Sequence, residues 1–296
     1  MESLIREWPV IVERNSRPPI GLILSATWGS ICLLAAIFGG ILPGPKWDDY
    51  DYESFSSPMF STGHFLGTDI DGSDIFAGVI HGARTSLGVS LLSVSLGLAI
   101  GGSLGILAAY RRGWVDRVLS MVFNVMLSVP NIVLVLVFVA VFSSPDINDP
   151  SSGLPKWIVL VFSFTIIVTP YLGRIARAST LSWTGREFVQ VAESIGMTRR
   201  SILWTHIVPN VVPSLISIYC LGTGVLIVVE GGLSILGLGF DSGGSWGSML
   251  AKNRNELAFA PHTTLIPATV IALTVMSLNY FADYMRIRID GRESRI

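Results

Sequence analysis

Six long apolar segments constrain this chain more than any other feature of its sequence. They cover residues 20–42, 86–109, 118–142, 157–173, 211–230 and 263–281. A helix needs about 20 apolar residues to cross the hydrocarbon core of a bilayer. Only 14% of the residues are charged, whereas soluble domains carry about 25%. The sequence therefore predicts an all-α, polytopic membrane protein with six transmembrane helices.

The placement of Lys and Arg residues predicts the orientation of these helices. Six crossings put both termini on the same side of the membrane. Fifteen of the 20 basic residues then fall on that side, and five fall on the other. Cytoplasmic loops carry an excess of Lys and Arg. We therefore expect both termini, and the loop at residues 186–210, to be cytoplasmic.

The predicted helices divide the chain into three parts. Residues 1–85 hold the cytoplasmic N-terminus, the first helix and an external segment rich in Asp and Glu. Residues 86–281 form a five-helix core that contains the loop at 186–210, and residues 282–296 form a cytoplasmic tail. The first apolar segment is too long for a signal peptide, and no small-residue cleavage site follows it. We therefore expect it to remain as a membrane helix.

Glycine and proline residues predict how the helices pack and bend. Gly97, Gly101 and Gly105 recur every four residues, so they share one helical face where another helix can approach closely. Proline removes a backbone hydrogen bond and tends to kink a helix. The prolines inside or near the ends of predicted spans are Pro130, Pro170, Pro213 and Pro267.

Glu230 is an ionisable residue at the outer end of the fifth apolar segment. Ionisable groups near membrane depth are candidates for a role in the transport pathway or in gating. An equally good interpretation is a carboxylate at the membrane interface whose partners are neighbouring backbone groups or water. The sequence leaves both interpretations open.

The loop between the fourth and fifth spans predicts two short helices. The first covers residues 187–195, where Phe188, Val191, Ala192 and Ile195 recur at helical intervals and form one apolar stripe. Gly196 follows, and glycine suits the left-handed conformation that ends many helices.

The second short helix is expected over residues 200–208 and should stop before Pro209. An amphipathic pair of this kind could lie on the lipid surface, with Arg199 and Arg200 among the head groups. It could also insert into a cleft on a partner protein. The spacing of Gly196 and Pro209 favours docking on a partner.

Several kinds of site are not predicted. The chain has no G-x-x-x-x-G-K-[ST] phosphate loop and no H-E-x-x-H, so we expect neither catalytic residues nor ATP binding in this chain. Two isolated cysteines and four scattered histidines predict no metal site. The net charge of −1 gives no indication of a nucleic-acid partner.

From about Phe65 to the C-terminus, the sequence resembles the inner-membrane permeases of the dipeptide, oligopeptide and nickel branch of type I ATP-binding-cassette (ABC) importers. The motifs that carry the resemblance lie at residues 64–69, 82–87, 113–116, 128–130, 206–210 and 233–239. The loop after Arg186 is similar to the "EAA" loop by which such permeases dock on their ATPases. This sequence departs from that motif at Gln190, where the family has Glu, and at Val191, where it has Ala.

The resemblance implies a MetI-like architecture in a bacterial inner membrane and a docking role for the loop. The residues to which it assigns ATPase coupling are Glu187, Phe188, Gln190, Val191, Ala192, Ile195, Gly196, His206 and Pro209. It also implies three kinds of partner: a second homologous permease, two ATPase subunits or one fused ATPase, and an extracytoplasmic solute-binding protein. ATP and Mg²⁺ would bind to the ATPase subunits, and this chain would hold no cofactor.

The resemblance implies import of dipeptides, oligopeptides or a related small solute, with nickel chelates, glutathione-like molecules and sugars as open alternatives. The rival interpretation is a secondary transporter or a channel that is not coupled to ATP. Such a protein commonly has inverted repeats and polar binding groups near the bilayer midplane. We find no repeat between the first and last three apolar segments, and no midplane charge.

Overall fold

The structure, a computed structural model, describes residues 19–41, 47–143, 153–240 and 244–293. The described residues form helices and loops without a β-sheet, and the only strand-like pairs are isolated bridges such as Tyr50 with Ser73. Eleven α-helices occur in this part of the chain: α1 Ile20–Phe38, α2 Ile75–Gly97, α3 Ser103–Arg111, α4 Gly113–Ser128, α5 Asn131–Phe142, α6 Lys156–Thr184, α7 Glu187–Ser194, α8 Arg199–Ile202, α9 Val208–Ile235, α10 Trp246–Asn253 and α11 Pro261–Glu293. The prediction of an all-α fold is confirmed.

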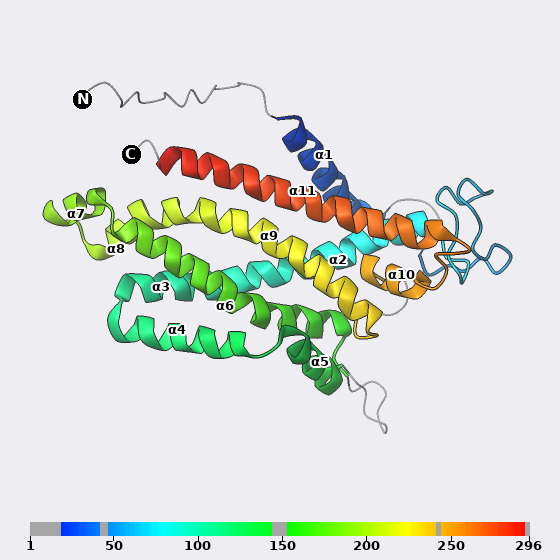
Figure 1. The fold of residues 1–296 in the computed structure, drawn as a ribbon, viewed down its shortest axis with the longest axis horizontal. Helices are drawn as coiled ribbons and strands as arrows, with labels where there is room; N and C mark the ends of the chain where they lie inside the picture. The colour runs from blue at the N-terminus through cyan, green and yellow to red at the C-terminus, as the bar shows by residue number, and fades with distance from the viewer. Residues whose placement is uncertain (1–18, 42–46, 144–152, 241–243, 294–296) are drawn as a thin grey trace, which may run out of the picture.

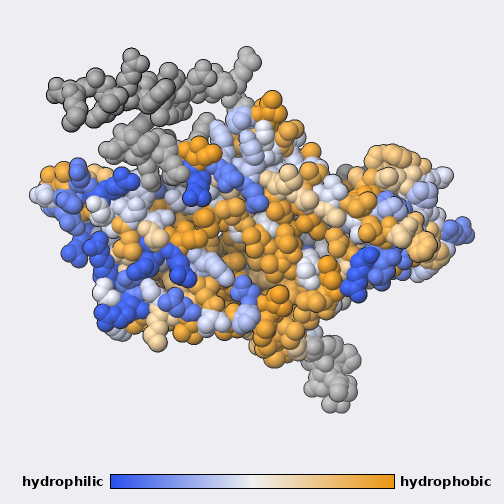
Figure 2. Space-filling view, viewed as in Figure 1, coloured by the Kyte–Doolittle hydropathy of each residue, from blue (hydrophilic) through white to orange (hydrophobic). Residues whose placement is uncertain are grey.

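Six membrane crossings fit the described helices. Five helical stretches are long and apolar enough to span a bilayer, and the bent pair α4 and α5 makes a sixth. The long helices lie side by side, with α7 and α8 at one end and α10 with the loop after α1 at the other (Figure 1). Figure 2 shows hydrophobic residues over the middle of the molecule and hydrophilic residues gathered toward both ends. This arrangement is that of a polytopic membrane protein.

The second span is longer than the predicted segment 86–109. It runs from Ile75 to Arg111 as one helical stretch of 37 residues, in which a π-helical turn, η1 (Leu98–Gly102), joins α2 to α3. The Asp74 side chain caps its start by accepting a hydrogen bond of 2.8 Å from the backbone N–H of Ala77. The predicted division between residues 85 and 86 therefore falls inside α2. The polar side chains of His81 and Arg84 lower the local hydropathy, so the apolar pattern places the start of this span too late in the sequence.

The third predicted span, 118–142, is two helices and not one. The pair α4 and α5 bends by 79° across Val129 and Pro130. Pro130 is the N-cap residue of α5, where its lack of a backbone N–H leaves no helical hydrogen bond broken. Pro170, Pro213 and Pro267 lie inside continuous helices, as the sequence predicted.

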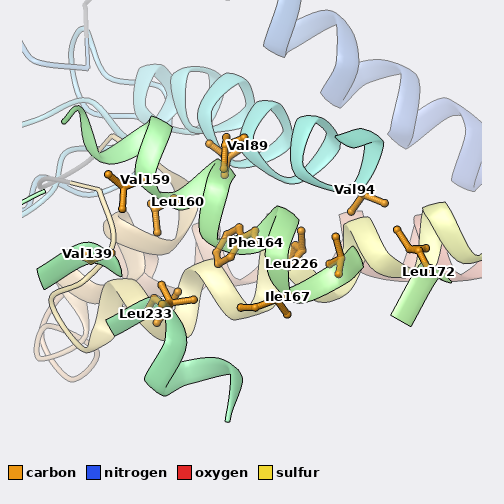
Figure 3. Close-up of a cluster of buried hydrophobic side chains, with 13 residues drawn as sticks. Val89, Val94, Val139, Val159, Leu160, Phe164, Ile167, Leu172, Leu226 and Leu233 are labelled. Atoms are coloured by element: carbon orange, nitrogen blue, oxygen red, sulfur yellow. The ribbon is translucent and has the colours of Figure 1, made fainter. Parts of the chain in front are cut away.

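A cluster of buried apolar side chains joins α2, α5, α6 and α9 (Figure 3). Phe164 of α6 and Leu226 of α9 lie near its centre and are almost fully buried. Lipid tails are as apolar as these side chains, so close packing rather than exclusion from water holds membrane helices together. The cluster makes α6 the central helix against which the others pack.

The three glycines of the second span face α6. A Cβ atom at Gly97 would collide with the Val168 side chain, and one at Gly101 would collide with the backbone carbonyl of Thr169. A Cβ atom at Gly105 would collide with the backbone carbonyl of Gly173. At these points the two helices approach so closely that only glycine fits.

Ion pairs hold the loop after α1 to α10 at one end of the molecule. Lys252 Nζ lies 2.6 Å from Asp69 Oδ2 and 2.8 Å from Asp71 Oδ2. Burial would lower the pKa of Lys252, but its hydrogen bonds to the two carboxylates raise it overall. His64 Nδ1 lies 2.8 Å from Asp74 Oδ2, so the same loop also contacts the start of α2. These contacts fix the conformation of the acidic segment that follows α1.

Candidate functional site

The α7 helix projects from one end of the helical bundle (Figure 1). It covers Glu187–Ser194, which agrees with the predicted helix at residues 187–195 to within one residue. Gly196 follows with a φ angle of +82°. Its N–H donates to Glu193 O and the Met197 N–H donates to Ala192 O, which is the Schellman pattern of helix termination. The prediction of a left-handed glycine here is confirmed.

The apolar residues of α7 lie on two faces and not on the single stripe that the sequence predicted. Ala192 and the neighbouring Val189 are buried, and Phe188 is half-buried beside them. Val191 and Ile195 remain exposed, at 59% and 72%. The difference arises because part of the stripe packs onto the bundle, which the residue pattern alone cannot show. The exposed pair, four residues apart, forms a small apolar ridge on the free face.

The buried face of α7 belongs to a second apolar cluster that ties the loop to the membrane helices. Trp183 from the end of α6 and Ile202 of α8 are among its buried members, and Ile207, Val211 and Leu215 extend it along the next helix. The Phe188 ring packs 6.1 Å from the Trp183 ring. The cluster therefore connects α7 to α6 and α9 through packed side chains.

The second short helix does not stop before Pro209, contrary to the prediction. α8, the π-helical turn η2 (Leu203–Ile207) and α9 form one continuous stretch from Arg199 to Ile235. The Val208 N–H donates to Leu203 O, five residues earlier, as in a π-helix. This wider turn relieves the clash that the Pro209 ring would make with a preceding carbonyl, so the helix continues.

The remaining predicted coupling residues lie on α7 or on the continuous helical stretch that begins at Arg199. Glu187 and Gln190 are exposed on α7, and Pro209 is exposed on α9. His206 is half-buried, with its ring 6.1 Å from the Phe188 ring. The structure thus brings the predicted residues into one region, although Val189, Ile202 and Trp183, which hold the region together, were not singled out. Their apolar spacing relative to Ala192 was the available signal.

Glu230 lies far from this loop, near the other end of α9, and is almost fully buried. Its Oε1 atom accepts hydrogen bonds from Ser245 Oγ at 2.7 Å and from Ser234 Oγ at 2.9 Å. Its Oε2 atom accepts a longer one, of 3.5 Å, from Ser86 Oγ. Gly247 lies close enough that a Cβ atom there would be 2.8 Å from Glu230 Oε2. The carboxylate therefore sits at the N-terminal end of α10, where a negative charge is favourable.

The partners of Glu230 were not found from the sequence. Ser245 is the N-cap residue of α10 and forms a capping box with Ser248, whereas Ser86 comes from α2 and lies 144 positions away along the chain. Ser245 is one residue before Trp246, whose N–H donates to Ser86 Oγ at 3.1 Å. A Ser-x-x-Ser pattern is too common to have indicated such a contact.

The fold and the loop together define a multi-pass membrane permease with a helix–turn–helix at one end. Residues 101–295 match the family described as "Binding-protein-dependent transport system inner membrane component". The chain belongs to this family, and it is a permease subunit of a type I ABC importer.

Two curated relatives match nearly the whole chain. The glutathione transport system permease protein GsiD of Pectobacterium atrosepticum is 33% identical over 304 residues, covering 98% of this chain and 97% of that protein. The dipeptide transport system permease protein DppC of Alkalihalophilus pseudofirmus is 31% identical over 283 residues, covering 95% and 88%. The similarity extends to the region before residue 101, which the family match leaves out.

The fold is similar to that of solved ABC transporter structures. An inward-facing form of the MetNI methionine ABC transporter matches with a TM-score of 0.58 at 15% identity, covering 72% of this chain and 96% of that chain. An amino acid ABC transporter matches with a TM-score of 0.52 at 15% identity, covering 69% and 90%. These matches confirm the MetI-like architecture.

Proposed function

We propose that this permease imports peptides or a closely related small solute, and that α7 is the element through which a partner ATPase drives it. The observation that carries the coupling role is the exposed ridge of Val191 and Ile195 on a helix whose opposite face is packed into the bundle. Exposed apolar side chains at the tip of a firmly held helix suit insertion into a cleft on another protein. The substrate class is supported by the relatives, which are named as glutathione and dipeptide transport permeases.

The partners follow from the same proposal. The chain pairs with a second permease, two ATPase subunits (or one fused ATPase) bind ATP and Mg²⁺ on the α7 side, and an extracytoplasmic binding protein delivers the solute at the α10 end. The excess of Lys and Arg among the loops at the α7 end supports a cytoplasmic position for that end and for both termini. ATP-driven closure of the ATPases then moves α7, and with it α6 and α9.

Our proposal for Glu230 is that it anchors α10 at the external end of the permease. Its hydrogen bonds to Ser245, Ser234 and Ser86 connect α10, α9 and α2. A carboxylate with this many donors is held in place, which supports an anchoring role rather than one in gating.

The double substitution of Val191 and Ile195 by Asp tests the coupling role. Two charges on the ridge should oppose burial in an apolar cleft, so the ATPase should no longer co-purify and ATP-driven uptake should be lost. Glu193→Gln, on another face of α7, is the matched control and should keep both. Retention of the ATPase and of uptake by the double variant would overturn the proposal for α7.

The substrate is tested on the intact complex, purified in mild detergent from its native membrane with its binding protein. Mass spectrometry of the ligand released from the binding protein, followed by ATP-dependent uptake of that ligand into proteoliposomes, should identify a peptide or a peptide-like solute. A released sugar or metal chelate that the complex imports would contradict the peptide assignment and leave the coupling role intact.

A further inference from the structure

The α4 helix carries a line of polar side chains although it belongs to a candidate membrane span. Asp116, Ser120, Asn124 and Ser128 recur every four residues, so they follow one side of the helix. Asn124 and Ser128 are exposed, and within the described part of the chain no group forms a hydrogen bond with the Asn124 side chain. An amide without a partner costs about 2–7 kcal/mol in an apolar medium. This side of α4 is therefore poorly suited to contact with lipid tails.

The opposite flank of α4 has the composition expected of a lipid contact. Val118 and Val122 are 39% and 46% exposed there. Between the two flanks, Phe123 is buried against α6, where a Cβ atom at Gly173 would collide with its ring. The helix thus has one face on the protein, one apolar face and one polar face. Figure 2 shows mixed colours over α4 but mostly hydrophobic colours over α5.

The polar line borders a groove between α4 and α6 of about 700 Å³. Its polar lining comprises Asp116, Arg117, Ser120, Asn124, Ser128 and Arg177, and Met121 and Val125 also line it. Arg177 Nη2 donates to Asp116 Oδ2 at 2.7 Å, so this ion pair joins the two helices at the groove. The groove follows α4 from its start at Gly113 to the bend before α5. It therefore runs from the α7 end of the molecule to the point where the span changes direction.

We propose that the polar face of α4, with Asn124 and Ser128 as its exposed groups, is this chain's wall of the water-filled path by which the solute leaves toward the cytoplasm. The inference rests on the proposed function and adds the face of the chain along which the solute moves. Amide and hydroxyl groups offer donors and acceptors to the peptide bonds and carboxylates of a small polar solute. The charges of Asp116 and Arg177 compensate each other, and their ion pair joins α4 to α6 beside this polar face.

Thiol labelling tests this assignment on the complete complex in proteoliposomes. Cys32 and Cys220 are first replaced by Ala, and then Asn124→Cys or Ser128→Cys is introduced, with Val118→Cys and Val122→Cys as matched controls on the apolar flank. A charged, membrane-impermeant thiosulfonate is applied from the α7 side. The cysteine thiolate attacks the sulfenyl sulfur of the reagent, forms a mixed disulfide and releases a sulfinate. Hydrocarbon disfavours the thiolate, so positions 124 and 128 should react about tenfold faster or more than the controls. The transported solute should slow the reaction at these two positions.

Two results would overturn the inference. One is labelling at positions 124 and 128 that is as slow as at the valine controls. The other is their efficient disulfide cross-linking to a helix of the second permease without labelling by the reagent, which would make this face a buried subunit contact. ATP-driven uptake by the parent lacking both cysteines is measured first. If the parent complex takes up solute with ATP but positions 124 and 128 are labelled slowly, only this inference is wrong. If uptake by the wild-type complex does not depend on ATP, the proposed function is wrong.

Discussion

At the scale of single residues, the structure explains polar groups whose partners lie far away in the sequence. Glu230 is satisfied by serines from three different elements, and His64 lies between two carboxylates. Each is the hub of a small network at the α10 end of the molecule. Networks of this kind are costly to disrupt because a buried donor left without an acceptor costs about 1–3 kcal/mol.

Glu230→Ala should lower the melting temperature of the purified complex and make α10 more sensitive to protease, because the Ser234 and Ser245 hydroxyls lose their acceptor. Glu230→Gln keeps one acceptor oxygen and should be milder. Thermal unfolding and limited proteolysis in detergent measure both effects. A Glu230→Gln variant with wild-type stability and no transport would contradict the anchoring role and favour a part in the pathway or in gating.

The contacts of His64 predict a pH-dependent stability for the loop at residues 47–74. Its hydrogen bond to Asp74, reinforced by Asp51, raises the pKa of the imidazole above 6.5. A raised pKa means that the folded state binds the proton more tightly, so this stabilisation is complete below about pH 6.5 and is lost as pH rises through the folded pKa. Amide hydrogen exchange in the loop should therefore quicken over that range, beyond the intrinsic effect of pH. The same pH response in His64→Gln would refute this role.

At the scale of helices, close packing against α6 decides where glycine is required. Gly101 meets the backbone of α6, whereas a Cβ atom at Gly88 in α2 would meet nothing within 4 Å. The two glycines lie in one helical stretch but face different surroundings. A sequence pattern identifies such glycines only where they recur at a regular interval.

Gly101→Val should destabilise the permease by about 3 kcal/mol or more, at or above the upper end of the usual cost of overpacking. The reason is that the added side chain would displace the α6 backbone at Thr169. Gly88→Ala is the control and should leave the melting temperature within a few degrees of the wild type. Equal melting temperatures for the two variants, measured in the same detergent, would contradict the proposed packing role of Gly101.

At the scale of the whole molecule, the bent pair of α4 and α5 completes an even number of crossings. An even number places both termini on one side, and the Lys and Arg distribution favours the cytoplasm for that side. The bend also separates the polar face of α4 from the apolar helix α5, so it sets the length of the groove along α4.

Reporter fusions test this topology. An enzyme active only in the cytoplasm should be active when fused after Ile296 and inactive when fused after Leu154, between α5 and α6. An enzyme active only outside the cytoplasmic membrane should show the reverse pattern. Equal activity of one reporter at both positions would mean that α4 and α5 do not cross the membrane together.

The sequence by itself determined the membrane class, the all-α fold, the number of crossings and the short helix after Arg186. These features depend on local composition and periodicity, which need no knowledge of neighbours. The tertiary structure alone decided that the stripe of α7 is split, that α9 continues through Pro209, that α4 and α5 meet at 79°, and that Ser245 and Ser86 hold Glu230. The π-helical turn before Pro209 and the bend at Pro130 are backbone conformations that the apolar periodicity of a segment does not specify. The split stripe and the partners of Glu230 depend on contacts between residues far apart in the chain, because burial and hydrogen-bond partners are properties of packed helices and not of any one segment.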